Sequence, residues 1–212
     1  MNLRDIDFYF ITDSSLTRKT VVEDAELAVR AGVKIIQYRE KNRPAGEMVI
    51  EAFQIKKACK EKALFLVNDR VDIALAVEAD GVHLGQEDMP CNIARVLLGR
   101  NKIIGVTAHD VKEAIDAEKA GADYIGASPV FDTNTKIDAG KAAGLELIRA
   151  IRKNVKIPIV AIGGINLDNV ASVMEAGADS AAAISAVIAS DDVEKECRRF
   201  AGEISAYKRA NK

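Results

Sequence analysis

The feature that most constrains the fold of this chain is a regular alternation of short apolar runs with longer amphipathic stretches. The apolar runs are rich in Ile, Val and Leu and are bounded by Gly, Pro, Asn or Asp, which predicts β-strands. The stretches between them place apolar residues at i, i+3 and i+4, which predicts α-helices. The predicted strands are residues 8–12, 35–39, 64–68, 82–84, 103–106, 124–127, 159–162 and 181–184. The predicted helices are residues 21–31, 48–62, 71–76, 92–98, 111–120, 144–154, 167–176 and 193–207.

Strict alternation of strand and helix favours a parallel sheet, and runs that are apolar throughout suit strands covered on both faces. Eight such units in 212 residues leave little more than the minimum length for each unit. The pattern therefore predicts an α/β protein, a closed (β/α)8 TIM barrel that forms a single domain over residues 1–212. A doubly wound open sheet is the alternative.

A recurring small-residue segment supports the barrel. Gly32, Gly81, Gly121 and Gly177 each stand between a predicted helix and the next strand, about two strand–helix units apart. We predict that each glycine takes the left-handed conformation at the end of its helix.

Composition excludes several function classes. The net charge is −2, only 5% of residues are aromatic and Trp is absent, so the chain lacks the basic surface and stacking platforms of a nucleic-acid binder. No apolar run approaches the roughly 20 residues that cross a bilayer, and the first residues lack a signal-peptide pattern, so we expect a cytoplasmic protein without a membrane partner. The three cysteines have neither zinc-ligand nor disulfide spacing and are expected to be reduced. The oligomeric state is not predicted.

Three cations follow the predicted strands. Arg39 and Lys41 are two residues apart at the end of the second strand, so an extended chain points them to the same side. Lys136 follows the sixth strand on a loop with two threonines. Cations and hydroxyl donors that converge on one mouth of a barrel indicate a site for phosphate groups. The alternative is that Arg39 and Lys41 are solvated or paired with Glu40.

Two carboxylates follow adjacent strands. Asp69 and Asp88 come after the third and fourth strands. Mg²⁺ is usually held by one or two carboxylates together with water and substrate phosphates, so this pair predicts a magnesium site beside the cations. The alternative for Asp69 is a helix N-cap, because a predicted helix follows it.

A second phosphate site is predicted after the last two strands. Gly163 and Gly164 follow the seventh strand, and Ile184 and Ser185 follow the eighth. Loops at these positions commonly bind a phosphomonoester through backbone N–H groups. A tight turn is the alternative. His83 is predicted to be structural, and His109 either reaches the mouth or has a surface or capping role. A diphosphate with Mg²⁺ on one side and a phosphomonoester on the other indicate group transfer with release of diphosphate.

Five ordered motifs resemble the thiamine phosphate synthase family. They are Gln37-Tyr38-Arg39-Glu40-Lys41, Asn68-Asp69-Arg70-Val71-Asp72-Ile73-Ala74, Ala79-Asp80-Gly81-Val82-His83-Leu84-Gly85-Gln86-Glu87-Asp88, Pro129-Val130-Phe131 with Thr133, Thr135 and Lys136, and Gly163-Gly164-Ile165-Asn166. The resemblance implies a transferase that joins a hydroxymethylpyrimidine diphosphate to a thiazole phosphate and releases thiamine phosphate and diphosphate. It also implies one Mg²⁺ ion and a dissociative mechanism through a pyrimidine methyl cation.

The resemblance implies a role for each matched position. Asp69 and Asp88 would bind the metal, and Arg39, Lys41, Thr107 and Lys136 would be catalytic. The pyrimidine diphosphate would be held by Gln37, Tyr38, Arg39, Glu40, Lys41, Asn68, Thr107 and Lys136. The thiazole phosphate would be held by Thr133, Asn134, Thr135, Gly164, Ile184 and Ser185.

The chain departs from the family pattern at a few positions. Thr107 stands where the family usually has Ser, Ser128 stands where it has Gly, and residues 138–143 lack the usual prolines. The loop over residues 132–143 is expected to act as a lid that excludes water. Two other functions are weighed: a thiazole tautomerase, which His109 would serve, and a non-catalytic barrel that binds thiamine phosphates. The predicted diphosphate and metal residues argue against both.

Overall fold

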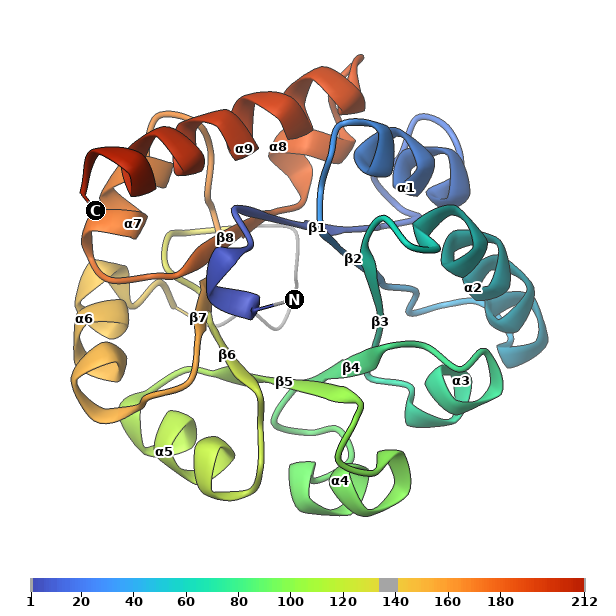
Figure 1. The fold of residues 1–212 in the computed structure, drawn as a ribbon, viewed down its shortest axis with the longest axis horizontal. Helices are drawn as coiled ribbons and strands as arrows, with labels where there is room; N and C mark the ends of the chain where they lie inside the picture. The colour runs from blue at the N-terminus through green and yellow to red at the C-terminus, as the bar shows by residue number, and fades with distance from the viewer. Residues whose placement is uncertain (1, 134–140, 212) are drawn as a thin grey trace.

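Eight parallel strands form a closed ring in the computed structural model, which describes residues 2–133 and 141–211. Each strand pairs with its neighbours in chain order, and the first strand pairs with the last. The helices surround this ring of strands (Figure 1). The predicted TIM barrel is therefore confirmed. The strands are β1 Phe8–Ile11, β2 Ile35–Tyr38, β3 Leu64–Asn68, β4 Gly81–Leu84, β5 Ile103–Ala108, β6 Tyr124–Ala127, β7 Ile159–Ala161 and β8 Ser180–Ala183.

The helices depart from prediction mainly at their ends. They are α1 Val21–Arg30, α2 Ala45–Cys59, α3 Val71–Ala76, α4 Cys91–Leu98, α5 Val111–Lys119, α6 Gly144–Asn154, α7 Val170–Glu175, α8 Ser185–Ile188 and α9 Val193–Ala210, with a short 3-10 helix, η1 Leu3–Asp5, before β1. The helix α8 is not predicted, because four residues are too few to show a period. Helix α2 begins a turn early, directly after Pro44, and ends early because Glu61 has a φ of 60°.

The start of α1 shows how local sequence sets an element. The Thr20 hydroxyl accepts a hydrogen bond from the Glu23 backbone N–H at 3.1 Å, and the Glu23 carboxylate accepts one from the Thr20 N–H at 3.1 Å. This reciprocal pair satisfies two amide groups that a helix terminus leaves without partners.

Three aspartates clamp strands together at the amino end of the barrel. Each stands before an even-numbered strand, donates its backbone N–H to the carbonyl of a residue in the preceding strand, and accepts that residue's N–H on its carboxylate. We call these the carboxylate clamps. They join Asp80 to Phe65 (2.8 Å), Asp123 to Ile104 (2.7 Å) and Asp179 to Ile159 (2.8 Å). Lys34 holds the corresponding position before β2, so the first pair of strands has no clamp.

The clamps clarify the glycine repeat. Gly32, Gly121 and Gly177 have φ values of 91°, 95° and 107°, as predicted for helix ends. The prediction for Gly81 is wrong. Gly81 is the first residue of β4, where an added Cβ would lie 2.0 Å from the Ile103 carbonyl oxygen, and Glu78 takes the left-handed conformation instead.

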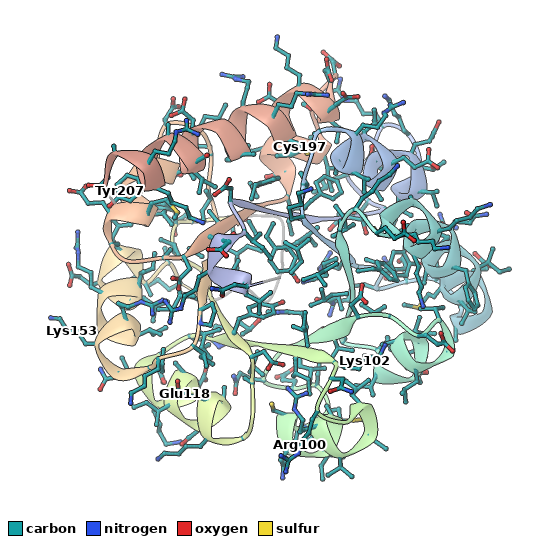
Figure 2. The ribbon with its side chains drawn as sticks, in the orientation of Figure 1. Arg100, Lys102, Glu118, Lys153, Cys197 and Tyr207 are labelled. Carbon is teal, nitrogen blue, oxygen red and sulfur yellow. The ribbon has the colours of Figure 1, made fainter. Side chains whose placement is uncertain are left out.

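The core extends from the barrel interior to the layer between strands and helices. Nearly every strand residue is buried, and side chains fill the centre of the ring, whereas the labelled Lys153 points outward from α6 (Figure 2). Cys59 and Cys197 are buried and Cys91 is half-buried, all as free thiols, as expected. Within the described ranges, no helix is long and apolar enough to cross a membrane.

Candidate functional site

Two cavities adjoin at the carboxyl end of the barrel. The first, which we call the carboxylate cavity, has a volume of about 250 Å³ and is lined by residues that follow β2 to β5. The second, which we call the glycine cavity, has a volume of about 530 Å³ and is lined by residues that follow β6 to β8. Ser128, directly after β6, lines both. The carboxylate cavity contains the predicted Arg39, Lys41, Asn68, Asp69, Asp88 and Thr107.

Arg39 is held in place by a buried carboxylate. Its guanidinium donates to Asp13, which is 3% exposed and follows β1. Among the described residues, no acceptor lies within hydrogen-bond distance of the buried Arg39 Nε. The guanidinium is therefore held at the cavity by its bond to Asp13. Asp13 is absent from the predicted site, because no local pattern connects it to a residue two elements later.

Lys41 pairs with one of the two predicted metal ligands. Its ammonium donates to Asp69 at 2.6 Å, and the Asp88 carboxylate accepts the backbone N–H of Gly85 at 2.7 Å. Burial raises the pKa of Asp69, and a hydrogen bond with Asp88 raises it further, while Lys41 lowers it. Two carboxylates in such close contact repel one another when both are ionised.

Asp69 does not cap the helix that follows. Its backbone has a φ of 61°, and α3 begins after Arg70 without a side-chain cap. The carboxylate turns instead toward Lys41 and the cavity. The alternative assignment of Asp69 as an N-cap is therefore wrong.

The donor set of the cavity fits a magnesium ion. Asp69 and Asp88 bring two hard oxygen ligands together, and a divalent cation would relieve their repulsion. Over residues 2–133 and 141–211, no group of three or more His, Cys, Asp or Glu side chains forms a metal-binding cluster. The remaining ligands would have to come from water and substrate oxygens, which is how Mg²⁺ is commonly bound.

Tyr38 and Glu40 lie outside this cavity. Successive side chains of a strand point to opposite faces, so Gln37 and Arg39 face inward while Tyr38 donates its hydroxyl to Glu51 on α2 at 2.7 Å. Burial raises the pKa of Glu40, but hydrogen bonds from the Ser14 hydroxyl and from backbone N–H groups lower it more. The pKa of Glu40 is therefore below its usual value. Neither Arg39 nor Lys41 pairs with Glu40, which contacts Arg43 instead.

A chain of hydrogen bonds crosses the barrel interior beneath the cavity. It runs from Gln37 Nε2 to Tyr9 Oη (2.8 Å), to Tyr124 Oη (2.7 Å), to His83 Nδ1 (2.9 Å), and from His83 Nε2 to Thr107 Oγ1 (2.8 Å). Burial raises the pKa of both tyrosines, so both stay protonated. His83 is thus a buried member of this interior chain, and it also lines the carboxylate cavity beside the predicted site residue Thr107.

The two tyrosines were missed by the sequence analysis, although a signal exists. Gly105 and Gly126 interrupt apolar strands, and glycine inside a strand often marks the close approach of a large group. An added Cβ at Gly105 would lie 2.0 Å from the Tyr124 ring, and one at Gly126 would lie 2.8 Å from the His83 ring.

The glycine cavity has the features of a small anion site. Gly163 and Gly164 have φ values of 102° and 61°, a conformation that glycine adopts freely. A Cβ at Gly164 would lie 2.5 Å from the Asp132 carbonyl oxygen, so only glycine fits there. Thr133, Ile184 and Ser185 also line this cavity, as the sequence predicts for the thiazole phosphate site.

Some predicted residues cannot be placed. Asn134, Thr135 and Lys136, and most of the predicted lid over residues 132–143, lie outside the described residues. His109 lines the carboxylate cavity and also contacts Glu113, which accepts from its backbone N–H at 2.7 Å and lies 2.9 Å from its Nδ1. His109 thus reaches the mouth, whereas the cap of α5 is Asp110, whose side chain accepts the Glu113 backbone N–H.

Comparison with known proteins agrees with this geometry. A family model described as thiamine monophosphate synthase matches residues 8–187. A thiamine-phosphate synthase of Methanosarcina mazei is 59% identical over 93% of this chain and 82% of its own length, and one of Methanosarcina barkeri is 53% identical over 98% and 94%. A solved thiamine phosphate pyrophosphorylase from Pyrococcus furiosus superimposes with a TM-score of 0.90 at 45% identity, over 97% of this chain and 99% of its own. The chain therefore belongs to the thiamine monophosphate synthase family.

Proposed function

We propose that this chain joins a hydroxymethylpyrimidine diphosphate to a thiazole phosphate, forming thiamine phosphate and releasing diphosphate. The observation that carries the proposal is the pairing of two adjoining cavities. One holds two cations beside two carboxylates, and the other is closed by a Gly-Gly turn. Membership of the family, at up to 59% identity over most of the chain, supports the same reaction.

The carboxylate cavity would receive the diphosphate. Arg39 and Lys41 both line this cavity and supply two positive charges. Their partners Asp13 and Asp69 hold both cations at the strand ends before the ligand arrives, so little reorganisation is needed. Asp69 and Asp88 would hold one Mg²⁺, which would supply further positive charge to the leaving diphosphate. Lys136 remains a predicted third cation.

The glycine cavity would receive the thiazole phosphate. Gly163 and Gly164 line this cavity without side chains, so a phosphate could approach their backbone N–H groups. The hydroxyl of Ser185 and that of Thr133 line the same cavity. The apolar lining from Ala182 and Ile162 suits the thiazole ring.

The reaction requires charge stabilisation and water exclusion more than it requires a base. In the dissociative mechanism, the bond between the pyrimidine methylene carbon and the diphosphate oxygen breaks, and its electron pair leaves with the diphosphate. The thiazole nitrogen then donates its lone pair to the methylene carbon. Arg39 and Lys41 would lower the barrier by stabilising the charge that develops on the leaving group.

We also expect the protein in the cytoplasm, which stays a prediction.

The test is a measurement of diphosphate release and of thiamine phosphate by mass, with each substrate and Mg²⁺ omitted in turn. We expect product only when both substrates and the metal are present. Lys41→Met is expected to reduce turnover by about 100-fold, the usual cost of removing one donor that stabilises developing charge. Asp88→Asn is expected to raise the Mg²⁺ concentration needed for half-maximal rate.

Matched controls separate these effects from a general loss of surface charge. Lys112 and Asp116 form an exposed pair on α5, away from both cavities, so Lys112→Met and Asp116→Asn should leave the rate unchanged. Failure to form thiamine phosphate under any condition, with both substrates bound, would refute the proposal. Isomerisation of the thiazole phosphate alone would favour the tautomerase, and binding without any reaction would favour a non-catalytic barrel.

A further inference from the structure

The hydrogen-bond chain inside the barrel has a direction that can be worked out by counting its hydrogens. Its five members come from five different strands and are all buried, with exposures between 1% and 8%. All four of its contacts fall between 2.7 and 2.9 Å, so each requires one hydrogen between the two atoms.

The direction is set at Gln37. An amide nitrogen donates and does not accept, so Tyr9 accepts from Gln37 Nε2. The described residues offer the Tyr9 hydroxyl one other partner, Tyr124, so the Tyr9 hydrogen must go there. If Tyr124 donated to Tyr9 instead, the buried Tyr9 hydrogen would have no acceptor, which is costly.

The same count continues to the cavity. Tyr124 accepts from Tyr9, so its own hydrogen goes to Nδ1 of His83. His83 is then neutral and carries its proton on Nε2, which donates to Thr107 Oγ1. The Thr107 hydroxyl therefore accepts from below, and its hydrogen is left to point into the carboxylate cavity that Thr107 lines.

We propose that Gln37, acting through Tyr9, Tyr124 and His83, fixes Thr107 as a hydrogen-bond donor toward the ligand. The ligand atom that faces Thr107 is consequently an acceptor, such as an unprotonated nitrogen of an aromatic heterocycle, and a ligand with an N–H at that position is rejected. The identification of that ring as the pyrimidine rests on the proposed function, but the direction of the chain does not. Tyr9 and Tyr124 are positioning residues, because they line neither cavity and act through His83 and Thr107, whereas His83 also lines the carboxylate cavity itself.

The surrounding strands make room for this chain. Gly105 lies opposite both His83 and Tyr124 in the sheet register, and Gly126 lies opposite Thr107. Any side chain at either glycine would overlap the Tyr124 or His83 ring. Two glycines in adjacent strands thus keep the aromatic members in the one arrangement in which all four contacts form.

The direction can be measured without substrate or activity. The chain has only two histidines, so imidazole nitrogen NMR shifts of His83 can be assigned with a His109→Gln variant. We expect the neutral Nε2–H tautomer at neutral pH. The Nδ1–H tautomer or a charged imidazolium would overturn the proposal.

Gln37→Glu tests whether Gln37 sets the direction. An ionised carboxylate accepts from Tyr9, so every hydrogen in the chain should reverse and His83 should become the Nδ1–H tautomer. The spectrum is recorded at a pH where the carboxyl carbon shift shows the introduced group to be ionised. An unchanged Nε2–H tautomer under that condition would refute the coupling.

A kinetic cycle tests whether the effect passes through Thr107. Thr107→Val and Gln37→Glu are each expected to raise the KM for the pyrimidine diphosphate about tenfold, the effect of losing roughly one hydrogen bond, with the KM for the thiazole phosphate unchanged. The double variant should be no worse than Thr107→Val alone, and Thr107→Ser, which keeps the hydroxyl donor, should recover most of the KM change that Thr107→Val causes. Additive effects would show that Gln37 acts independently. If the NMR result holds but no thiamine phosphate forms, the proposed function fails while this inference stands.

Discussion

Replacement of Gly164 by Ala gives a sharp test of how the glycine cavity is built. Gly164 has a φ of 61°, and a Cβ there would lie 2.5 Å from the Asp132 carbonyl oxygen and 2.7 Å from the Phe131 Cβ. Both neighbours belong to the segment after β6 that continues to Thr133 at the cavity wall. The added methyl group must therefore displace backbone rather than the flexible end of a side chain.

The cost can be separated into two parts. A left-handed conformation costs a non-glycine residue roughly 1–2 kcal/mol, and the loss of glycine's freedom in the unfolded chain returns about 0.4–1 kcal/mol. The overlap adds about 1–3 kcal/mol, as other small-to-large changes in packed sites do. Gly144 separates the two parts, because it has a φ of 70° and no atom within 4 Å of its added Cβ.

The assay compares thermal unfolding and steady-state kinetics of Gly164→Ala and Gly144→Ala. The overlap should lower the Tm of the Gly164 variant roughly 2–12 °C below that of the Gly144 variant, at about 2–4 °C per kcal/mol for a chain of this size. If the Phe131–Asp132 segment moves aside instead, the KM for the thiazole phosphate should rise at least tenfold, because small misplacements near a site are costly. Gly202→Ala in the interior of α9, with no atom near its added Cβ, should be stabilised by about 0.5–1 kcal/mol.

The reasoning would be refuted if the Gly164 and Gly144 variants had the same Tm and the same KM. That result would mean that the segment after β6 accommodates a methyl group at no cost, and that the tightness of the Gly-Gly turn plays no part in the site.

Three further predictions concern groups outside the two cavities. Burial raises the pKa of Asp24 more than its neighbours lower it, so the folded state binds its proton more tightly than the unfolded state, and stability is lost as the pH rises through the folded pKa. Urea unfolding at neutral pH should therefore show Asp24→Asn to be more stable than the native chain by about 1–3 kcal/mol. The reasoning would be contradicted if this extra stability persisted at a pH below the usual aspartate pKa. Asp123→Ala leaves the buried Ile104 N–H without an acceptor and should lower the free energy of unfolding by about 1–3 kcal/mol. Asp123→Asn should lower it less. A raised KM in either variant would contradict the expectation that the clamp is too far from the site to affect it. Tyr38→Phe removes only the hydrogen bond to Glu51 and should leave the KM of both substrates unchanged, which a tenfold increase would disprove.

The fold was predictable because its information is local. Each strand is a short apolar run and each longer helix shows its own period, so the number and order of elements follow without knowledge of contacts. Element ends were harder, since Pro44 and Glu61 act through backbone geometry that no hydrophobic period records. Gly81 shows the same limit, because a glycine at a helix end and one at a strand start look alike in sequence.

The site was predictable where its residues directly follow strands. Parallel strands bring their carboxyl ends together, so Arg39, Lys41, Asp69 and Asp88 could be assigned to one mouth from their positions alone. Tyr38 was included with its neighbours although the alternation of the strand turns it toward α2. Asp13 was missed because its role depends on a contact between loops that only the closed barrel creates.

The carboxylate clamps divide the ring of strands into pairs, β3 with β4, β5 with β6, and β7 with β8. The chain ends lie close together, since Lys208 on α9 donates to the carbonyl of Arg4 at 3.0 Å. The chain could therefore be circularly permuted, with its old ends joined and new ends opened elsewhere. New ends placed between α4 and β5 keep each clamped pair within one continuous segment, whereas new ends between α5 and β6 split a pair and leave its clamp to form across the whole length of the permuted chain.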